Sequence, residues 1–118
     1  MRASATASPL AEVGAIPLAR YFRVLGDPTR LAILEALLER ERTVSELVEL
    51  IGAPQSRVSN HLACLRWCRF VDTERRGRSA AYRIADERVG EVVRLAASLA
   101  EPICDHLASC TRIGPDWI

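Results

Sequence analysis

Four cysteines carry the most distinctive chemistry in this 118-residue sequence. Cys64 and Cys68 are four positions apart, and side chains at this spacing lie one above the other on a helix. Cys104 and Cys110 lie close to the C-terminus. Two stacked thiolates and a third from a distant segment form a trigonal set of soft ligands, which suits Cd(II), Pb(II), Hg(II) or As(III) but not Mg(II) or Ca(II). We therefore predict a soft-metal site that uses Cys64, Cys68 and one of the two later cysteines.

Other roles for the cysteines remain open from the sequence alone. Cys64 and Cys68 could pack as small hydrophobic side chains, or they could hold a structural zinc ion. Alternatively, Cys64 and Cys68, with Arg66 and Arg69 nearby to favour the thiolate, or the tail pair Cys104 and Cys110 could act as a thiol redox switch. An enzyme with a cysteine nucleophile is not expected, because the sequence supplies no recognisable oxyanion site for it.

The composition indicates one folded domain in a reducing compartment. Hydrophobic residues make up 49% of the chain, and the formal net charge is only +1. No apolar run of about eighteen residues is present, so we expect no transmembrane helix, and the N-terminus lacks the apolar core of a secretion signal. We expect a cytoplasmic protein with no membrane partner, whose reduced thiols are available for metal binding or redox chemistry.

The cysteine pair lies in a segment, residues 54–69, that is predicted to form one helix. Pro54 suits the first helical turn. The spacing of one buried face is shown by Val58, Leu62 and Leu65. The opposite side carries Ser56, Ser59, Asn60, Ala63 and Trp67. A flank beside the buried face carries Cys64, Cys68 and His61, which is therefore an additional candidate ligand. A metal ion on this flank would move or repack the helix rather than block its outer side.

The segments before this helix carry start and stop signals for two more helices. Asp27 suits the N-cap of a helix over residues 28–40. Its predicted buried face is Leu31, Leu34, Leu37 and Leu38. Thr43 and Glu46 have the spacing of a capping box, which opens a short helix through Ile51. The turn over residues 52–54 then leads directly into the cysteine-bearing helix.

A β-hairpin is predicted directly after residues 54–69. Residues 70–75 and 79–84 have the composition of strands, and residues 76–78 form the tip. Six arginines against two acidic residues between positions 66 and 83 give a local charge of +4. Two helices joined by a tight turn and followed by such a hairpin are typical of a winged helix-turn-helix that binds DNA. The predicted DNA-binding residues are Gln55, Ser56, Arg57, Ser59, Asn60, Arg75, Arg76 and Arg78.

The two ends of the chain are expected to pair in a homodimer. Residues 9–25 have a helix-like apolar pattern interrupted by Gly14 and Pro17. A last helix is expected from Asp86 until Pro102 kinks or ends it. Its apolar stripe is too broad for the surface of a small monomer, so we expect it to bury against a second copy together with the first helix. The stripe consists of Val89, Val92, Val93, Ala96, Leu99, Ala100 and Ile103. The aromatic residues interpreted as packing residues are Tyr21, Phe22 and Trp67.

The predicted fold class is mainly α with a small β-hairpin, in the order α-α-α-α-β-β-α. Residues 1–8 are expected to be disordered, because they are small and polar. Residues 9–108 are expected to form the DNA-binding and dimerisation domain. Residues 109–118 are then a C-terminal tail with a possible metal ligand.

The sequence resembles the ArsR/SmtB family of metal-sensing transcriptional repressors over about residues 18–108. The matching segments occur in the family's order and spacing: LGDPTRLAIL at residues 25–34, SNHL at 59–62 followed by Leu65, and RGR at 76–78 followed by Tyr82. The resemblance implies a dimeric winged helix with an added N-terminal and C-terminal helix. It also implies a repressor that binds two-fold symmetric operator DNA and lets go when metal binds.

Branches of this family hold metal at different places, and the sequence resembles one branch. The arsenic/cadmium type has Cys-Val-Cys in the first helix of the helix-turn-helix, where residues 44–47 here read VSEL. The zinc type pairs Asp and His residues along the last helix, where no His precedes Pro102. The Cys-x3-Cys in the second helix, with a tail cysteine, resembles the actinobacterial cadmium/lead sensors and equally the mercury sensors. The resemblance thus implies Hg(II), Cd(II) or Pb(II) as effector, with As(III) ranked below them and the choice between Cys104 and Cys110 open.

Overall fold

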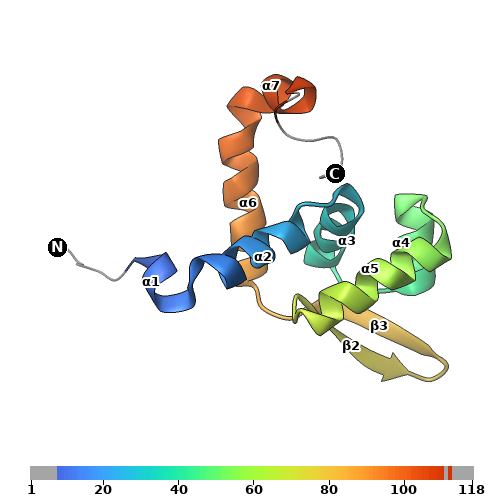
Figure 1. Cartoon of the computed structure of the whole chain (residues 1–118). Coiled ribbons are helices and arrows are strands. Elements are labelled where there is room, and N and C mark those ends of the chain that lie inside the picture. The colour runs from blue at the N-terminus through green and yellow to red at the C-terminus, as the bar shows by residue number, and fades with distance from the viewer. Residues whose placement is uncertain (1–7, 111, 113–118) are drawn as a thin grey trace.

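The computed structural model describes residues 8–110 and residue 112 as a mainly helical chain with one small antiparallel sheet (Figure 1). In chain order the elements are α1 (Pro9–Val13), α2 (Ala15–Leu25), α3 (Pro28–Glu39), β1 (Arg42–Thr43), α4 (Val44–Ile51), α5 (Gln55–Trp67), β2 (Val71–Arg76), β3 (Ser79–Ile84), α6 (Arg88–Ala100), the 3₁₀ turn η1 (Glu101–Ile103) and α7 (Cys104–Ser109). This order confirms the mainly α class and the winged helix-turn-helix, formed by α4, α5 and the β2–β3 wing. Two of the predicted segments lie largely outside the described residues. These are the N-terminus predicted to be disordered, of which residues 1–7 are not described, and the predicted C-terminal tail, of which residues 111 and 113–118 are not described.

The N-terminal segment forms two helices rather than one interrupted helix. Gly14 has a φ of 95°, a backbone conformation that favours glycine, and it separates α1 from α2. Pro17 lies in the first turn of α2, where its missing N–H would have had no partner within the helix. The predicted helical pattern is therefore correct, but only Gly14 breaks it.

The wing belongs to a three-stranded sheet in the order β1-β3-β2, not to an isolated hairpin. The two-residue strand β1 pairs Arg42 with Tyr82 of β3, and a strand this short shows no alternating pattern in the sequence. At the other edge Arg76 pairs with Ser79, so β2 runs one residue further than predicted. Gly77 begins the two-residue tip with a φ of 62°, the positive φ that short hairpin loops require.

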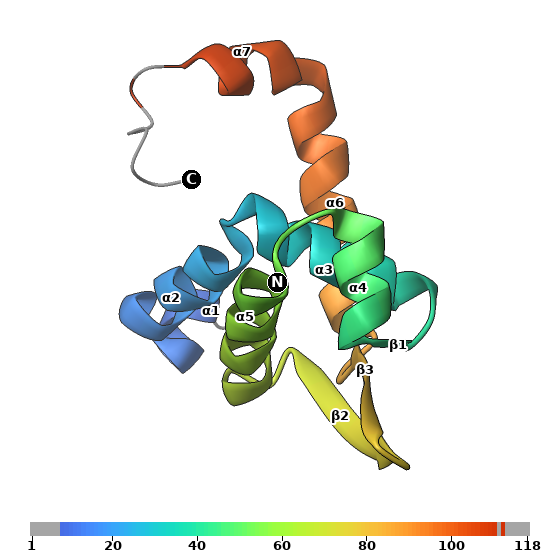
Figure 2. The same cartoon turned by 90° about the vertical axis from the view of Figure 1, so that its right-hand side faces the viewer.

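The core lies where α3, α4 and α5 pack against one another and against the sheet (Figure 2). The predicted buried face of α5 is confirmed, since Val58, Leu62 and Leu65 are fully buried. The predicted face of α3 was partly wrong, because Leu31 is 39% exposed whereas Ile33 is fully buried. Ile33 and Ala36, rather than Leu31 and Leu38, share the inner face with the other two leucines of the prediction.

α6 extends away from the core and carries α7 at its far end (Figures 1 and 2). Pro102 lies in η1, so α6 ends where the proline was predicted to end it. Large apolar side chains along the outer helices are exposed in the single chain: Leu10, Val13, Ile16, Phe22, Leu95, Leu99, Ile103 and Leu107. Within residues 8–110, no helix is both long and apolar enough to cross a membrane.

Candidate functional site

Local capping signals place α5 against the rest of the domain. The Asp27 carboxylate accepts a hydrogen bond from the Arg30 N–H at 3.0 Å and so caps α3, as predicted. Thr43 and Glu46 form the predicted capping box at the start of α4. Gly52 ends α4 with a left-handed φ of 78°, which turns the chain directly into α5. We call α5 the recognition helix from here on.

The outer side of the recognition helix is open to solvent. The predicted DNA-binding residues Gln55, Ser56, Arg57 and Asn60 are exposed, and Ser59 is half-buried. Trp67 continues this side and is 88% exposed, so its interpretation as a packing residue was wrong for the single chain. It is exposed because it lies opposite the three buried residues of the helix, at the helix end, where no other element of the domain covers it.

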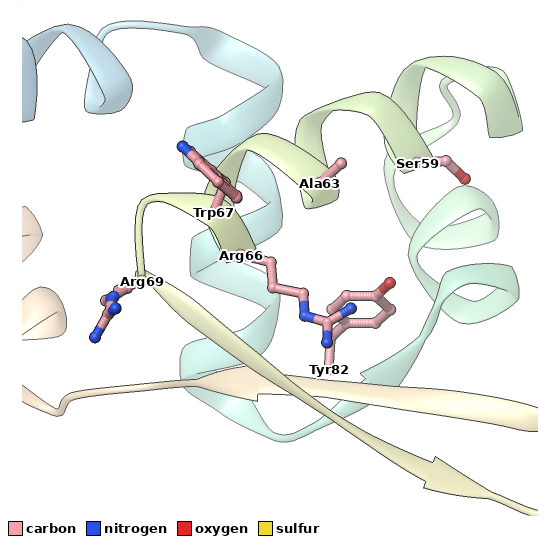
Figure 3. Close-up of a pocket in the computed structure, with 6 residues that line it drawn as sticks. All are labelled: Ser59, Ala63, Arg66, Trp67, Arg69 and Tyr82. Carbon is pink, nitrogen blue, oxygen red and sulfur yellow. The ribbon is translucent and has the colours of Figure 1, made fainter.

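A groove of about 620 Å³ separates the recognition helix from the wing (Figure 3). Its lining residues are Ser59, Ala63, Arg66, Trp67, Arg69 and Tyr82. Figure 3 shows the Arg66 side chain reaching across the groove toward the ring of Tyr82. Of the six residues, the sequence prediction had assigned only Ser59 to DNA binding. The spacing of Ser59, Ala63 and Trp67, four residues apart, was the available signal for a continuous groove wall.

The wing carries positive charge, but acidic neighbours pair with part of it. Arg76 forms an ion pair with Glu41, in the turn before β1, and its Nε lies 3.7 Å from Glu74. Arg83 also pairs with Glu74, at 3.0 Å. The other two predicted wing contacts are exposed side chains: Arg75 and Arg78.

The recognition helix ends earlier than predicted, between Cys64 and Cys68. Its last residue is Trp67, and Cys68 is the C-cap, whose N–H donates to the Cys64 carbonyl at 2.9 Å. Arg69 then takes a φ of 66°, and the Phe70 N–H closes the end on the Leu65 carbonyl at 2.8 Å. The predicted helix through residue 69 was therefore two residues too long, because Arg69 adopts the conformation in which a glycine usually ends a helix.

The Cys64 and Cys68 side chains lie one helical turn apart at the end of the recognition helix. Burial and the neighbouring Cys64 thiol raise the pKa of Cys68, while the guanidinium of Arg30 works in the opposite direction. Cys64 is half-buried and Cys68 is exposed. The two sulfurs are thus close enough to share one ion, and one of them is open to solvent.

The comparisons with known proteins agree with the winged helix-turn-helix fold. The sequence profile of the bacterial regulatory proteins of the arsR family matches residues 27–73. A probable mercury resistance operon repressor of Streptomyces lividans is 47% identical over 95 residues, which cover 80% of this chain and 76% of that protein. The chain belongs to the ArsR family. It is therefore a DNA-binding transcriptional regulator and not an enzyme, as the sequence predicted.

Two further relatives extend the comparison. The transcriptional regulator KmtR of Mycobacterium tuberculosis is 40% identical over 93 residues, covering 79% of this chain and 72% of its own. The solution structure of the homodimeric winged helix-turn-helix domain of a possible ArsR-family regulator from Mycobacterium bovis superposes with a TM-score of 0.70 at 28% identity. The superposition covers 86% of this chain and 94% of that one.

The tail cysteines of this ArsR-family chain lie far from the recognition-helix pair. Cys104 begins α7 and is exposed, and Cys110 follows α7 and is half-buried. Figures 1 and 2 both place α7 beyond α6, away from α5. Among residues 8–110 and 112, no three His, Cys, Asp or Glu side chains lie close enough together to hold a metal ion. A single chain in this conformation thus brings together two of the predicted ligands and not the third.

Both ring nitrogens of His61, the additional candidate ligand, face residues of α3. Nδ1 lies 3.3 Å from Nη1 of Arg30, and Nε2 lies 3.8 Å from Oδ1 of Asp27. A metal ion would have to displace one of these partners to reach the ring. His61 thus connects two helices in this structure, which leaves the thiols as the open donors on this flank.

The arginines expected to favour a reactive thiolate are not the ones that affect the pKa of Cys68. Arg66 and Arg69 were expected to favour the thiolate, but both line the groove on the far side of the helix. Arg30 of α3 is the cation that lowers the pKa of Cys68, and its effect is outweighed. The Cys68 thiol therefore keeps its proton more firmly than an ordinary cysteine, which is unfavourable for rapid oxidation.

Proposed function

We propose that this ArsR-family regulator is a homodimeric repressor whose affinity for operator DNA falls when Hg(II), Cd(II) or Pb(II) binds cysteine thiolates. The observation that carries the proposal is the pair of thiols one turn apart at the end of the recognition helix, Cys64 in its last turn and Cys68 at its C-cap. The pair lies beside the buried face and not on the outer side that would meet DNA. As(III) also takes thiolate ligands and ranks below the three divalent ions.

The exposed apolar helices support a dimer. α1, α2, α6, η1 and α7 together expose eight large apolar side chains, more than scattered surface residues account for. A second copy packed on these helices would bury them, and the related Mycobacterium bovis domain is homodimeric. Two recognition helices related by a two-fold axis would then reach successive major grooves, about 34 Å apart.

The groove and the wing supply the DNA contacts in this proposal. Residues at the start of the recognition helix are placed to meet base edges, namely Gln55, Ser56, Arg57, Ser59 and Asn60. Arg66, Arg69 and Tyr82 line the groove with groups suited to phosphate oxygens. Arg75, Arg76 and Arg78 extend the same basic surface along the wing.

The donor set fits a soft ion once a third thiolate arrives. Cys64 and Cys68 supply two adjacent sulfurs, which alone leave a soft divalent ion short of a ligand. Cys104 or Cys110 is the third donor, supplied by the partner subunit's tail or by a tail that has moved. With a soft ion held by Cys64, Cys68 and one of these tail cysteines, the tail would be fixed to the end of the recognition helix. Repacking of the helix then lowers operator affinity through a coupling of order 1–3 kcal/mol.

Thiolate-to-metal absorption tests the site directly. The full-length protein is titrated with Cd(II) and Hg(II), and so is each of four variants: Cys64→Ser, Cys68→Ser, Cys104→Ser and Cys110→Ser. We expect the ultraviolet charge-transfer band to weaken in both recognition-helix variants and in one tail variant, while the other tail variant serves as the matched control. A wild-type protein without the band, or recognition-helix variants with an unchanged band, would show that the proposal is wrong.

A thiol redox switch of the same fold is the alternative, because Cys64 and Cys68 are free cysteines one helical turn apart. Peroxide would then release operator DNA without metal, and a reductant would restore binding. The raised pKa of Cys68 predicts slow oxidation, so we expect metal to act at concentrations where peroxide has no effect.

A further inference from the structure

Arg30 links three helices beside the cysteine pair. Its Nε donates to the Val24 carbonyl at 2.6 Å and its Nη2 to the Arg23 carbonyl at 3.2 Å, so the guanidinium holds the C-terminal end of α2. Its Nη1 donates to Nδ1 of His61, in the middle of the recognition helix, at 3.3 Å. One side chain near the start of α3 thus fixes α2 and α5 relative to each other.

Asp27 completes the cluster from the other side of the imidazole. A guanidinium has no acceptor, so Nδ1 of His61 accepts from Arg30 and the ring N–H is at Nε2, which faces Asp27 Oδ1 at 3.8 Å. Burial opposes the charged carboxylate, but the hydrogen bond from the Arg30 N–H and the charge of Arg30 lower the pKa of Asp27. Asp27, Arg30 and His61 are called the α3–α5 joint below.

The joint lies next to the thiols. His61 is three residues before Cys64 on the same flank of the recognition helix, one turn away. Cys68 is one turn further along the same flank, so the joint and the cysteine pair occupy consecutive turns of the chain. A shift of the helix at the cysteine pair therefore also changes the contact between His61 and Arg30.

We propose that the α3–α5 joint sets the position of the recognition helix for operator binding, and that metal at the cysteine pair lowers operator affinity by disturbing the Arg30–His61 contact. The disturbance of the joint by metal rests on the proposed function, whereas the role of the joint in positioning the helix does not. Both side chains are half-buried between α3 and α5, not on the outer side. They are thus positioning residues that touch no DNA.

The test compares His61→Leu with His61→Asn in the full-length protein. The DNA is a duplex selected from a random-sequence pool by the metal-free wild type. The leucine variant has no acceptor for Arg30, whereas the asparagine amide oxygen reaches the place of Nδ1. We expect His61→Leu to bind the duplex about tenfold more weakly, within the usual range of coupling between sites. His61→Asn should bind close to wild type.

Three further readouts separate positioning from a merely structural role or a DNA contact. The dependence of affinity on salt concentration should stay unchanged in His61→Leu, whereas Arg57→Ala, which removes a predicted phosphate or base contact, should flatten it. The affinity for Cd(II) without DNA should also stay unchanged. The ratio of operator affinities without and with Cd(II) should fall toward one. Arg30→Lys, which keeps the charge but loses the forked geometry, should behave like His61→Leu.

Two results would contradict the positioning role of the joint: His61→Leu binds the duplex as tightly as wild type, or His61→Asn binds it as weakly as His61→Leu. If His61→Leu binds more weakly but keeps the wild-type ratio of operator affinities without and with Cd(II), only the proposed effect of metal on the joint would be wrong. A wild-type protein that does not respond to Cd(II), Pb(II) or Hg(II) would instead refute the proposed function. The comparison of His61→Leu with His61→Asn without metal would still test the positioning role of the joint.

Discussion

At the scale of single residues, the cysteine pair combines closeness with a raised pKa at one sulfur. Burial and the neighbouring Cys64 thiol raise the pKa of Cys68. An oxidant reacts with the thiolate, so the raised pKa slows oxidation of Cys68. A soft metal ion must displace the same proton, so metal binding at this sulfur should weaken as the pH falls.

Asp27→Asn tests the charge at the start of α3. The pKa of Asp27 is lowered in the folded protein, so its contribution to stability is present at neutral pH and is lost as the pH falls through the folded value. Asparagine keeps the cap but not the charge, and we expect a loss at pH 7 of less than about 1 kcal/mol, typical of a charge at a helix N-terminus. Thermal unfolding from pH 7 to pH 2 measures it.

The control for this prediction is Asp72→Asn, on the exposed side of β2, which removes the same charge away from any helix. The difference between wild type and Asp27→Asn should shrink toward zero in acid. A difference that stays constant down to pH 2 would mean that the carboxylate charge contributes nothing.

Arg69 adopts a left-handed φ of 66° that costs about 1 kcal/mol for a residue other than glycine. Such a residue in a groove beside the predicted DNA-binding side indicates a functional reason for the arginine. Arg69→Gly should therefore stabilise the fold by up to about 1 kcal/mol, since glycine tolerates this φ, and weaken operator binding. Arg69→Lys, with charge and strain kept, should change neither greatly. Urea unfolding and duplex binding measure both effects, and unchanged binding by Arg69→Gly would contradict the assigned role.

Residue-level chemistry was only partly predictable from the sequence. The i, i+4 spacing of Cys64 and Cys68 is local, and it correctly indicated neighbouring sulfurs. The contact between Arg30 and His61 joins positions 31 residues apart, so no local pattern revealed it. The exposure of Trp67 was visible in its helical position, but its size favoured a packing role.

At the scale of elements, the wing is tied to the turn before β1 by the ion pair between Arg76 and Glu41. The carboxylate holds Arg76 away from phosphates and adds negative charge near them. Glu41→Gln should therefore tighten operator binding and steepen its salt dependence by about one unit, the effect of one more phosphate contact. Fluorescence anisotropy at several salt concentrations measures both. Glu91→Gln, an exposed position on α6, is the control, and identical curves for the two variants would contradict the prediction.

Element order was readable from the sequence because the start and stop signals are local. Asp27, the Thr43 capping box and Gly52 each act within a few residues, and all three behave as predicted. The boundaries that failed depend on other parts of the chain. β1 exists only because β3 pairs with it, and the recognition helix ends at Trp67 because the chain turns there to enter the wing.

At the scale of the whole molecule, the proposed operator binding requires a dimer formed by the helices that the single chain leaves exposed. Leu99 of α6 is 69% exposed, so Leu99→Glu should leave the folded chain intact but place a charge in the predicted dimer interface. We expect a monomer by light scattering and at least about a tenfold loss of duplex affinity, since each half-site would be bound alone. Ser98→Glu, at the neighbouring exposed position, is the control. A dimeric Leu99→Glu protein with full affinity would place the interface elsewhere.

Release of operator DNA by metal is the measurement that tests the central claim most directly. The selected duplex is labelled with a fluorophore, bound by metal-free protein, and titrated with Cd(II), Pb(II) and Hg(II) in wild type and in Cys64→Ser. The account predicts that at least one ion lowers wild-type affinity by about 5–150-fold, the usual range of coupling between two sites, and leaves Cys64→Ser bound. Unchanged wild-type binding with all three ions, or equal release of Cys64→Ser, would contradict it.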